Sequence, residues 1–437
     1  MLTSKSASRL DNDVTILADL LRTIFERNER RSNIEFDHDE RSITELCDAL
    51  ITTTSETSAL IIANKVLAKY SNLNDDEKLS FFQDVSSRMS IDPDRVRETL
   101  KDYEKLPSRE TYENFSNAAE PSRQELIRRL NQPPGATKKL VEMRADLLRL
   151  GKNDPGLQAF DLDIKHLFAS WFNRGFLVLR PISWESPAHI LEKIIAYEAV
   201  HAIDSWEDLR RRLEPRDRRC FAFFHPAIPD EPLIFVEVAL TKGTPTSIQV
   251  LLSEDREEVQ VDQINTAVFY SISNCQAGLA NVSFGNFLIK QVASDLSLEL
   301  PGLATFITLS PIPGLVKWLQ KSHPDWIVDE EADLRSLAAH YLIHEKSHNN
   351  LPLDPVARFH LGNGAIVEQI HSDADNSENG KLQSLGCMVN YLYDLEQVTK
   401  NHEDFVSKGK VIASKEIEKL AKASKLESRA AGEPSNE

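Results

Sequence analysis

Two short motifs in the C-terminal half of the chain each hold one reactive side chain on constrained backbone. Ser310 lies in residues 309–314, LSPIPG. The proline after it keeps the serine out of the helical region, and the Pro-Gly pair that follows favours a turn, so we expect the hydroxyl on a loop with little freedom. His360 lies in residues 357–365, ARFHLGNGA, just ahead of a GNG turn. A serine and a histidine held in this way could cooperate in acid–base chemistry.

Each of these two side chains also has other interpretations. Ser310 could be a nucleophile, a hydrogen-bond donor to a substrate carboxylate, or a plain polar residue of a loop. His360 is flanked by Phe359 and Leu361, so a half-buried histidine bonded to backbone is its structural alternative. Taken singly, neither motif decides between a catalytic and a structural role.

A third candidate is a loop between an expected strand and the start of an expected helix. A helix N-terminus offers unpaired N–H groups and the positive end of the helix dipole, and the glycine in this loop lets a ligand approach the backbone closely. A pyrophosphate would fit there, and a plain turn is the alternative. The loop consists of Ala280, Asn281, Val282, Ser283, Phe284, Gly285 and Asn286.

The other histidines and the arginines give weaker signals. His340 and His344 are four residues apart on one expected helix, but no glutamate lies between them, so we expect no metal site. The arginine-rich stretch of residues 210–219 could contact phosphates or form a solvated face.

Length, charge and cysteine content limit the class of protein. A chain of 437 residues is long enough for two domains, and its net charge of -17 argues against broad binding to nucleic acid or to anionic membranes. No apolar run approaches the ~20 residues of a membrane span. The four cysteines lie far apart, which favours a reducing compartment, and the N-terminus lacks the apolar core of a signal peptide. We therefore expect a cytoplasmic protein.

The use of glycine divides the chain in two. The first of the 15 glycines is Gly135, which is typical of a helical region before it. Apolar residues at helical spacing predict an all-helical bundle over residues 1–172, suited to packing or assembly. Helices are expected at residues 16–25, 60–67, 76–89, 93–103, 123–131 and 138–150.

After about residue 172 the pattern changes to short apolar strands separated by proline and glycine. Consecutive strands with short connections predict a mostly antiparallel sheet, and a later strand, loop, helix and strand predict a crossover unit. The sequence therefore predicts an α+β domain over residues 173–437, with a disordered polar tail at 427–437. Strands are expected at residues 220–224, 232–240, 247–252, 267–272, 304–309 and 387–393, and helices at 287–298, 313–321, 331–345 and 407–424.

In combination these motifs make the chain resemble malonyl-CoA decarboxylases. The likeness extends over residues 140–425, and its set of motifs is highly specific. The matching runs are residues 144–148 (RADLL), 171–172 with 175–177 (WF, GFL), 198–201 (EAVH), 269–273 (FYSIS), 287–290 (FLIK), 309–314, 359–361 with 363–365, and 390–391 with Tyr393.

The resemblance implies a helical N-terminal domain and a catalytic domain of the GNAT-like acyltransferase fold, in which a strand, loop and helix bind the pyrophosphate of CoA. The third candidate loop takes that place, although the family has an acidic residue where this chain has Ser283. The family's catalytic serine falls on Ser310 and its catalytic histidine on His360. Three further positions match residues of the active site or its surroundings: Tyr393, Ser271 and Lys193.

The implied activity is that of a carboxy-lyase in fatty acid metabolism, which converts malonyl-CoA to acetyl-CoA and CO2. The thioester carbonyl is the electron sink, so no cofactor or metal is expected besides the CoA of the substrate. His360 is expected to protonate the enolate carbon as a general acid, and Ser310 to bind the carboxylate. A bacterial homo-oligomer that assembles through the helical domain is expected.

Three other functions remain open on the sequence. A CoA-dependent N-acyltransferase shares the implied fold and would need an amine acceptor. A hydrolase would use Ser310 as a covalent nucleophile and release free CoA. A non-catalytic acyl-CoA sensor would bind the ligand without turnover.

Overall fold

The computed structural model describes residues 39–282, 288–323 and 331–424. The helix expected at residues 16–25 and the tail at 427–437 lie outside these ranges. The chain divides into two compact units, the first made of Met1–Asn173 with Gln276–Val282 and the second of Arg174–Cys275 with Ser283–Glu437. The first unit thus receives a short segment from the middle of the second.

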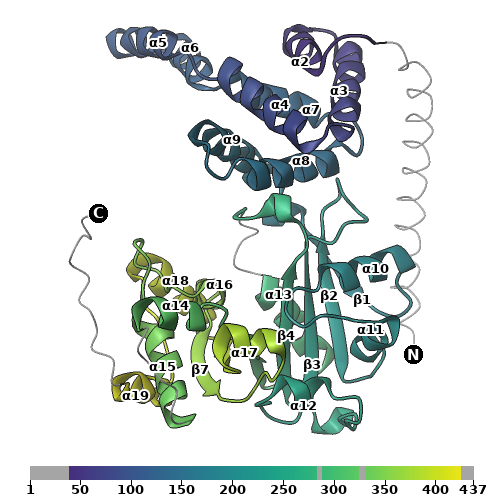
Figure 1. The fold of residues 1–437 in the computed structure, drawn as a ribbon, viewed down its shortest axis with the longest axis vertical. Helices are drawn as coiled ribbons and strands as arrows, with labels where there is room; N and C mark the ends of the chain where they lie inside the picture. Colours follow the sequence, from purple (N-terminus) through teal and green to yellow (C-terminus); the bar gives the residue numbers. More distant parts are fainter. Residues whose placement is uncertain (1–38, 283–287, 324–330, 425–437) are drawn as a thin grey trace. The chain divides into compact units, whose positions relative to one another are not determined.

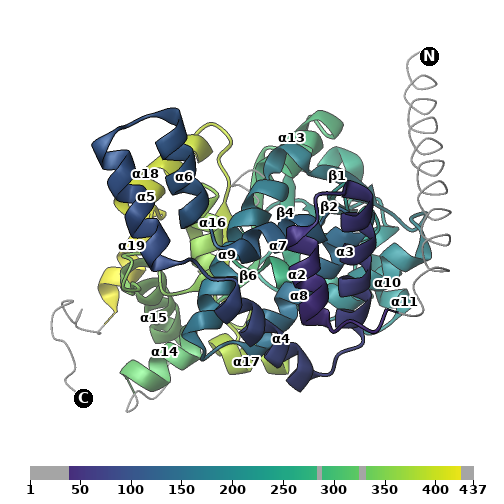
Figure 2. The same ribbon diagram turned by 90° about the horizontal axis from the view of Figure 1, so that it is seen from above.

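The part of the first unit that the structure describes is helical, as predicted. Capping boxes at Ser42 and Asn74 begin two of its helices, and Asp92 and Asp154, each followed by proline, begin two others. Figures 1 and 2 show α5 and α6 packed side by side as a hairpin. The helices are α2 (Ile43–Thr52), α3 (Glu56–Ser71), α4 (Asp75–Arg88), α5 (Pro93–Lys105), α6 (Arg109–Ala119), α7 (Ser122–Leu130), α8 (Ala136–Leu150) and α9 (Pro155–Trp171).

An aromatic cluster joins three of these helices. Phe82 of α4 lies 5.8 Å from Tyr70 of α3 and 6.2 Å from Phe160 of α9, measured between ring centroids. Phe82 is fully buried, and rings at these tilted and edge-on angles pack favourably. Burial of these side chains holds the centre of the helical unit together.

The segment of residues 276–282 packs against α8 within the first unit. The buried guanidinium of Arg144 donates hydrogen bonds to the carbonyl oxygens of Gly278, at 2.7 Å, and Ala280, at 3.0 Å. Its Nε donates to the carboxylate of Asp161 on α9 at 2.7 Å. Because an ideal Cβ on Gly278 would lie 1.8 Å from the carbonyl oxygen of Val141, only glycine fits this contact.

We expect Gly278→Ala to destabilise the protein, because the added methyl forces the segment away from the backbone of α8. Over-packing of this kind costs about 1–3 kcal/mol, readable as a shift of the urea midpoint. Gly302→Ala is a matched control, since the nearest atom to its Cβ is 3.4 Å away. Equal midpoints for the two variants would contradict this reading of the contact.

The second unit is built on an eight-stranded mixed sheet, ordered β1-β2-β3-β4-β5-β8-β6 with β7 paired to β8. β4 and β5 run parallel across the predicted crossover, and the other pairs are antiparallel, so the predicted mixed, mostly antiparallel sheet is confirmed. The strands are β1 (Val178–Ile182), β2 (Arg218–Phe224), β3 (Ile234–Thr241), β4 (Thr266–Asn274), β5 (Thr305–Thr308), β6 (Ser310–Pro311), β7 (Ile366–His371) and β8 (Met388–Leu392).

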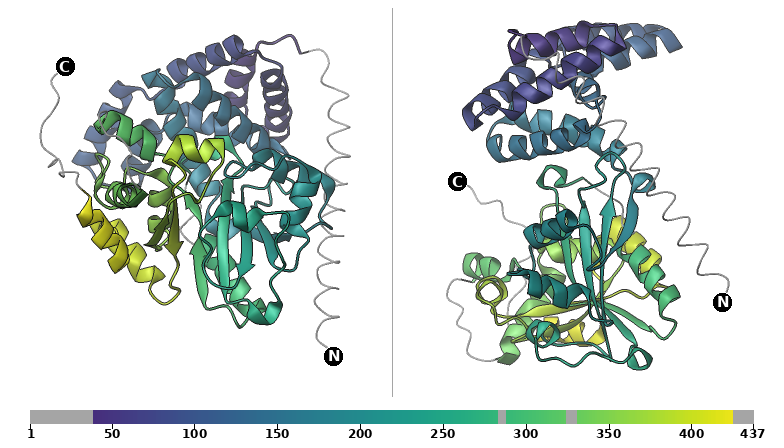
Figure 3. Two further views of the ribbon diagram at one scale, coloured as in Figure 1. Left: turned by 60° about the horizontal axis from the view of Figure 1, so that its bottom comes forward. Right: turned by 90° about the vertical axis from the view of Figure 1, so that its right-hand side faces the viewer.

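Helices cover both faces of this sheet (Figure 3). Apolar side chains of α10 and α11 pack on the face that carries Cys220, Phe235 and Cys275. None of the described helices has the length and apolar character needed to cross a membrane. The helices are α10 (Ala188–Tyr197), α11 (Trp206–Leu213), α12 (Ile248–Leu252), α13 (Leu288–Glu299), α14 (Leu315–Ser322), α15 (Glu331–His344), α16 (Pro355–Gly362), α17 (Glu378–Ser384), α18 (Val398–Lys408) and α19 (Lys415–Ala423).

Two predicted elements are wrong. Residues 247–252, expected as a strand, form helix α12, which buries Ile248 and Leu251 at helical spacing. The helix expected at residues 407–424 corresponds to α19, which begins only at Lys415, because the preceding helix α18 ends at Lys408. Gly409 separates them, because its φ of 62° is left-handed and ends α18.

Candidate active site

Ser310 lies at the start of β6 and is buried. It was expected on a loop, but its backbone is extended and paired with Val389 of β8. As expected, the proline that follows keeps Ser310 out of the helical region, but the serine lies in a strand and not in a turn. Pairing with β8 holds the hydroxyl more firmly than a loop would.

His360 lies in the last turn of α16, directly ahead of the turn that the sequence predicts. Asp354 caps the start of this helix by accepting hydrogen bonds from the N–H groups of Val356 and Ala357, both at 2.9 Å, and Pro355 follows the cap. His360 is 3% exposed, so its imidazole is almost completely shielded from water.

The serine and the histidine meet. Ser310 Oγ lies 3.2 Å from His360 Nε2, and His360 Nδ1 lies 2.8 Å from the hydroxyl of Tyr393. Tyr393 follows β8 and is buried, with its ring 6.2 Å from that of Phe269 on β4. The structure thus brings three of the predicted residues, Ser310, His360 and Tyr393, into one hydrogen-bonded line.

A second tyrosine of β8 packs on the histidine. The ring of Tyr391 stacks on His360 with centroids 4.5 Å apart and planes 21° from parallel. Its hydroxyl is buried and has no hydrogen-bond partner among the described residues. Tyr391 therefore fixes the plane of the imidazole by contact, not by a hydrogen bond.

Burial sets the charge of this line. Loss of water lowers the pKa of His360 to about 3, so the imidazole is neutral at pH 7. Burial also raises the pKa of Tyr393 and that of Tyr391, and both phenols stay protonated. The site therefore rests as an uncharged chain of hydrogen-bonding groups.

This neutral histidine predicts a pH dependence of stability. The pKa is about 3 in the folded protein and 6.5 in the unfolded chain, so His360 contributes stability above pH 6.5 that is lost as the pH falls towards 3. Between pH 7 and pH 5 the wild type should lose about 2 kcal/mol of unfolding free energy more than His360→Asn. Urea titrations of both proteins at the two pH values measure this difference, and equal losses would mean that folding does not lower the pKa of His360.

Thr308 is a member of the site that the motifs did not point to. Ser310 Oγ donates a hydrogen bond to Thr308 Oγ1 at 2.8 Å. The carbonyl of Thr308 accepts from the side-chain amide of Asn390, which also contacts His371 Nε2 through its oxygen at 2.5 Å. Residues two apart on extended backbone share a face, so spacing from Ser310 is the signal that could have found Thr308.

Ser271 lies on the other face of the sheet. The pairing of β3 with β4 passes from Glu237 opposite Ser271 to Val238 opposite Phe269, which leaves Tyr270 as the extra residue of a β-bulge. Ser271 consequently shares the face of Cys220, whereas Ser310 projects from the opposite one.

The hydroxyl of Ser271 donates to the carboxylate of Glu198, at 2.7 Å and 2.9 Å. The same carboxylate accepts from the backbone N–H groups of Val200 and His201, both at 2.8 Å. The structure does not join Ser271 to the line of Ser310 and His360, and its role in the substrate pocket stays a prediction.

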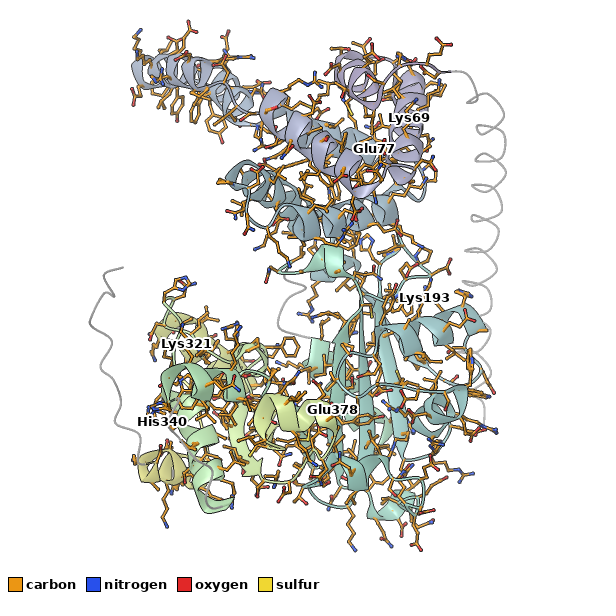
Figure 4. The ribbon with its side chains drawn as sticks, in the orientation of Figure 1. Lys69, Glu77, Lys193, Lys321, His340 and Glu378 are labelled. Atoms are coloured by element: carbon orange, nitrogen blue, oxygen red, sulfur yellow. The ribbon has the colours of Figure 1, made fainter. Side chains whose placement is uncertain are left out.

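Lys193 lies on α10 (Figure 4). Its ammonium donates to the carboxylate of Glu231 at 2.9 Å and to the carbonyl of Asp230 at 2.7 Å. These contacts give Lys193 a structural role, and neither of them involves Ser310 or His360. The link of Lys193 to activity therefore also stays a prediction.

The predicted CoA loop is described only at its start. Ala280, Asn281 and Val282 belong to the segment that packs in the first unit, and Asn281 has a left-handed φ of 59°. The other four predicted residues, Ser283, Phe284, Gly285 and Asn286, lie outside the described residues. Within the described ranges, no group of three or more His, Cys, Asp or Glu side chains could hold a metal ion.

The arginine-rich stretch forms ion pairs. Arg212 is buried and bonded to Asp208 and Glu237, and Arg210 pairs with Glu214. These contacts favour a structural role for the stretch over a phosphate site.

Comparison with known proteins agrees with the resemblance. The family model for the malonyl-CoA decarboxylase C-terminal domain matches residues 175–331 and 322–431, and the model for the N-terminal domain matches residues 89–172. The mitochondrial malonyl-CoA decarboxylases of Anser anser anser and Mus musculus are each 35% identical over 343 residues, which is 67% of this chain and 68% and 69% of theirs.

Two solved structures are also similar. Malonyl-CoA decarboxylase from Rhodopseudomonas palustris aligns with a TM-score of 0.81 at 45% identity, covering 86% of this chain and 98% of its own. The enzyme from Agrobacterium vitis aligns with the same TM-score at 47% identity, covering 86% and 99%. The chain therefore belongs to the malonyl-CoA decarboxylase family and is a carboxy-lyase.

Proposed function

We propose that His360 and Ser310 carry out the decarboxylation of malonyl-CoA to acetyl-CoA and CO2. The observation that carries this proposal is the buried line from Ser310 through His360 to Tyr393, with distances of 3.2 Å and 2.8 Å. A hydroxyl and an imidazole in this arrangement can bind a carboxylate and then deliver a proton.

In the proposed reaction, Ser310 donates a hydrogen bond to the malonyl carboxylate. The arriving negative charge favours the protonated imidazole, so His360 takes up a proton from solvent as the substrate binds. The bond between the carboxylate carbon and C2 then breaks, CO2 leaves, and the electron pair passes to the thioester oxygen as an enolate. This electron sink belongs to the substrate, so the proposal needs no cofactor.

The enolate carbon forms where the carboxylate was attached, next to Ser310. The serine gives its hydrogen to this carbon, and His360 Nε2 replaces that hydrogen on the serine. The substrate anion and one proton are both consumed, which leaves neutral acetyl-CoA and a neutral imidazole with its hydrogen on Nδ1. The resting form returns when Nε2 takes up a proton from solvent and Nδ1 releases one. Tyr393 keeps Nδ1 oriented throughout.

The proposal is tested with malonyl-CoA as the only substrate. Formation of acetyl-CoA and CO2 supports it, and a reaction in D2O should place one deuterium in the acetyl group. Release of free CoA would instead indicate a hydrolase, a requirement for an amine would indicate an acyltransferase, and binding without turnover would indicate a sensor.

Ser310→Ala should lower kcat by about 10²-fold. Without the hydroxyl, the malonyl carboxylate has no hydrogen-bond donor, and no group passes the proton from His360 to the carbon. Ser297→Ala is a matched control, since the Ser297 hydroxyl donates only to the carbonyl of Ala293 within α13. Steady-state kinetics of both variants give the comparison. Near-full activity of Ser310→Ala would remove the serine from the mechanism.

A further inference from the structure

The contacts of Thr308 determine the direction in which the hydrogen bonds of the site run. We propose that Thr308 is a positioning residue that keeps the Ser310 hydroxyl pointing away from His360, so that His360 rests with its hydrogen on Nε2. The effect of Thr308 on kcat rests on the proposed function, whereas the resting tautomer of His360 does not.

A count of hydrogens leads to this conclusion. The geometry between the two hydroxyls has Ser310 donating and Thr308 accepting, at 2.8 Å. A serine hydroxyl has one hydrogen, so Ser310 cannot also donate to His360. The 3.2 Å contact between Ser310 Oγ and His360 Nε2 is then a bond donated by Nε2–H. His360 Nδ1 carries no hydrogen in this tautomer and accepts from the hydroxyl of Tyr393 at 2.8 Å.

Thr308 is held so that it cannot easily turn away. It is fully buried, and its Oγ1 accepts the backbone N–H of Tyr391 at 3.0 Å. Its carbonyl accepts the side-chain amide of Asn390 at 2.6 Å. Both donors are consecutive residues of β8, so this strand fixes the side chain and the main chain of Thr308 together.

This direction separates proton delivery from nucleophilic catalysis. A serine nucleophile needs a histidine whose bare nitrogen faces the hydroxyl and accepts its hydrogen. Here His360 Nε2, which faces Ser310, already carries a hydrogen, so it can donate to the serine but cannot accept from it. Thr308 therefore suits the pair to protonating a carbon and works against the formation of an acyl-serine.

Nitrogen NMR of the protein labelled with ¹⁵N-histidine measures the tautomer directly, at pH 7 and without substrate. His360→Asn identifies the signals of His360 by their loss. We expect the Nε2–H tautomer in the wild type and in Thr308→Ser, which keeps a hydroxyl acceptor. In Thr308→Val the serine loses that acceptor and should turn to Nε2, which converts His360 to the Nδ1–H tautomer. An Nδ1–H tautomer in the wild type would overturn the inference, whether or not the valine variant folds.

Kinetics give the second readout. Thr308→Val should lower kcat by about tenfold or more with little change in KM, and Thr308→Ser should restore it, because a well-placed proton donor is worth ~10² to 10⁴ in rate. An unchanged tautomer together with an unchanged kcat in Thr308→Val would refute the role of Thr308. If the wild type shows the Nε2–H tautomer but does not decarboxylate malonyl-CoA, the proposed function fails and the inference stands.

Discussion

His360→Asn should lose almost all decarboxylation, with kcat lower by about 10² to 10⁴ and a smaller change in KM. Asparagine can fill part of the space of the imidazole, but it cannot pass a proton to Ser310. The enolate would then depend on chance protonation by water, which burial of the site opposes. Single-turnover measurements with malonyl-CoA separate this chemical step from binding and product release.

A second buried histidine provides the control. His340 lies on α15 (Figure 4), in the same unit as His360. It is 4% exposed and stacks on Trp318, and none of its described contacts is with Ser310. His340→Gln removes an aromatic ring of the same size and should keep kcat within about twofold, since it has no part in proton transfer. Comparable activity of His360→Asn and His340→Gln would exclude the proposed general acid.

Asp161→Asn should be among the most destabilising single changes in the helical unit. It leaves the fully buried guanidinium of Arg144 without its charged partner, while the bonds to Gly278 and Ala280 remain. Uncompensated buried charges of this kind cost about 3–5 kcal/mol. Asp161 is 22% exposed, so we expect a value near the lower end, measured as a loss of unfolding free energy in urea.

An exposed ion pair gives the matched comparison. Arg97 and Asp94 on α5 keep 63% and 89% of their side-chain surfaces exposed, so Asp94→Asn should change stability by less than about 0.5 kcal/mol. If Asp161→Asn costs no more than Asp94→Asn, water or another group compensates Arg144 and the burial argument is wrong.

The bounds of α4, α7 and α8, which bury apolar side chains, were predicted to within two residues. Those of α5 were predicted as closely although it has no buried residue. Three others, α2, α6 and α9, were missed. Only Ala118 is buried in α6, so that helix has almost no stripe to detect. The start of α9 did carry a signal, an aspartate cap followed by proline, which apolar spacing alone overlooks.

Ser310 and His360 were candidates because each lies in a short motif that restricts its own backbone, and the resemblance to the family then implied their roles. Spacing from Ser310 places Thr308 on the same face, but the contacts that give Thr308 and Tyr391 their roles depend on the register of β8 beside β5 and β6. The face on which Ser271 lies depends on the bulge at Tyr270, and β4 is buried on both faces, so its sequence has no alternation that would reveal a bulge. Assembly through the helical unit, cytoplasmic location and the role of Lys193 stay predictions.

The return of residues 276–282 to the helical unit has a consequence for synthesis on the ribosome. Arg144 binds the carbonyls of Gly278 and Ala280, which are 134 and 136 positions later in the chain. When the first 173 residues have emerged, the guanidinium still lacks these acceptors and must wait for more than a hundred further residues to be translated. Domains usually fold in the order of their synthesis. Here the N-terminal unit can reach its final state only after much of the second unit has been made.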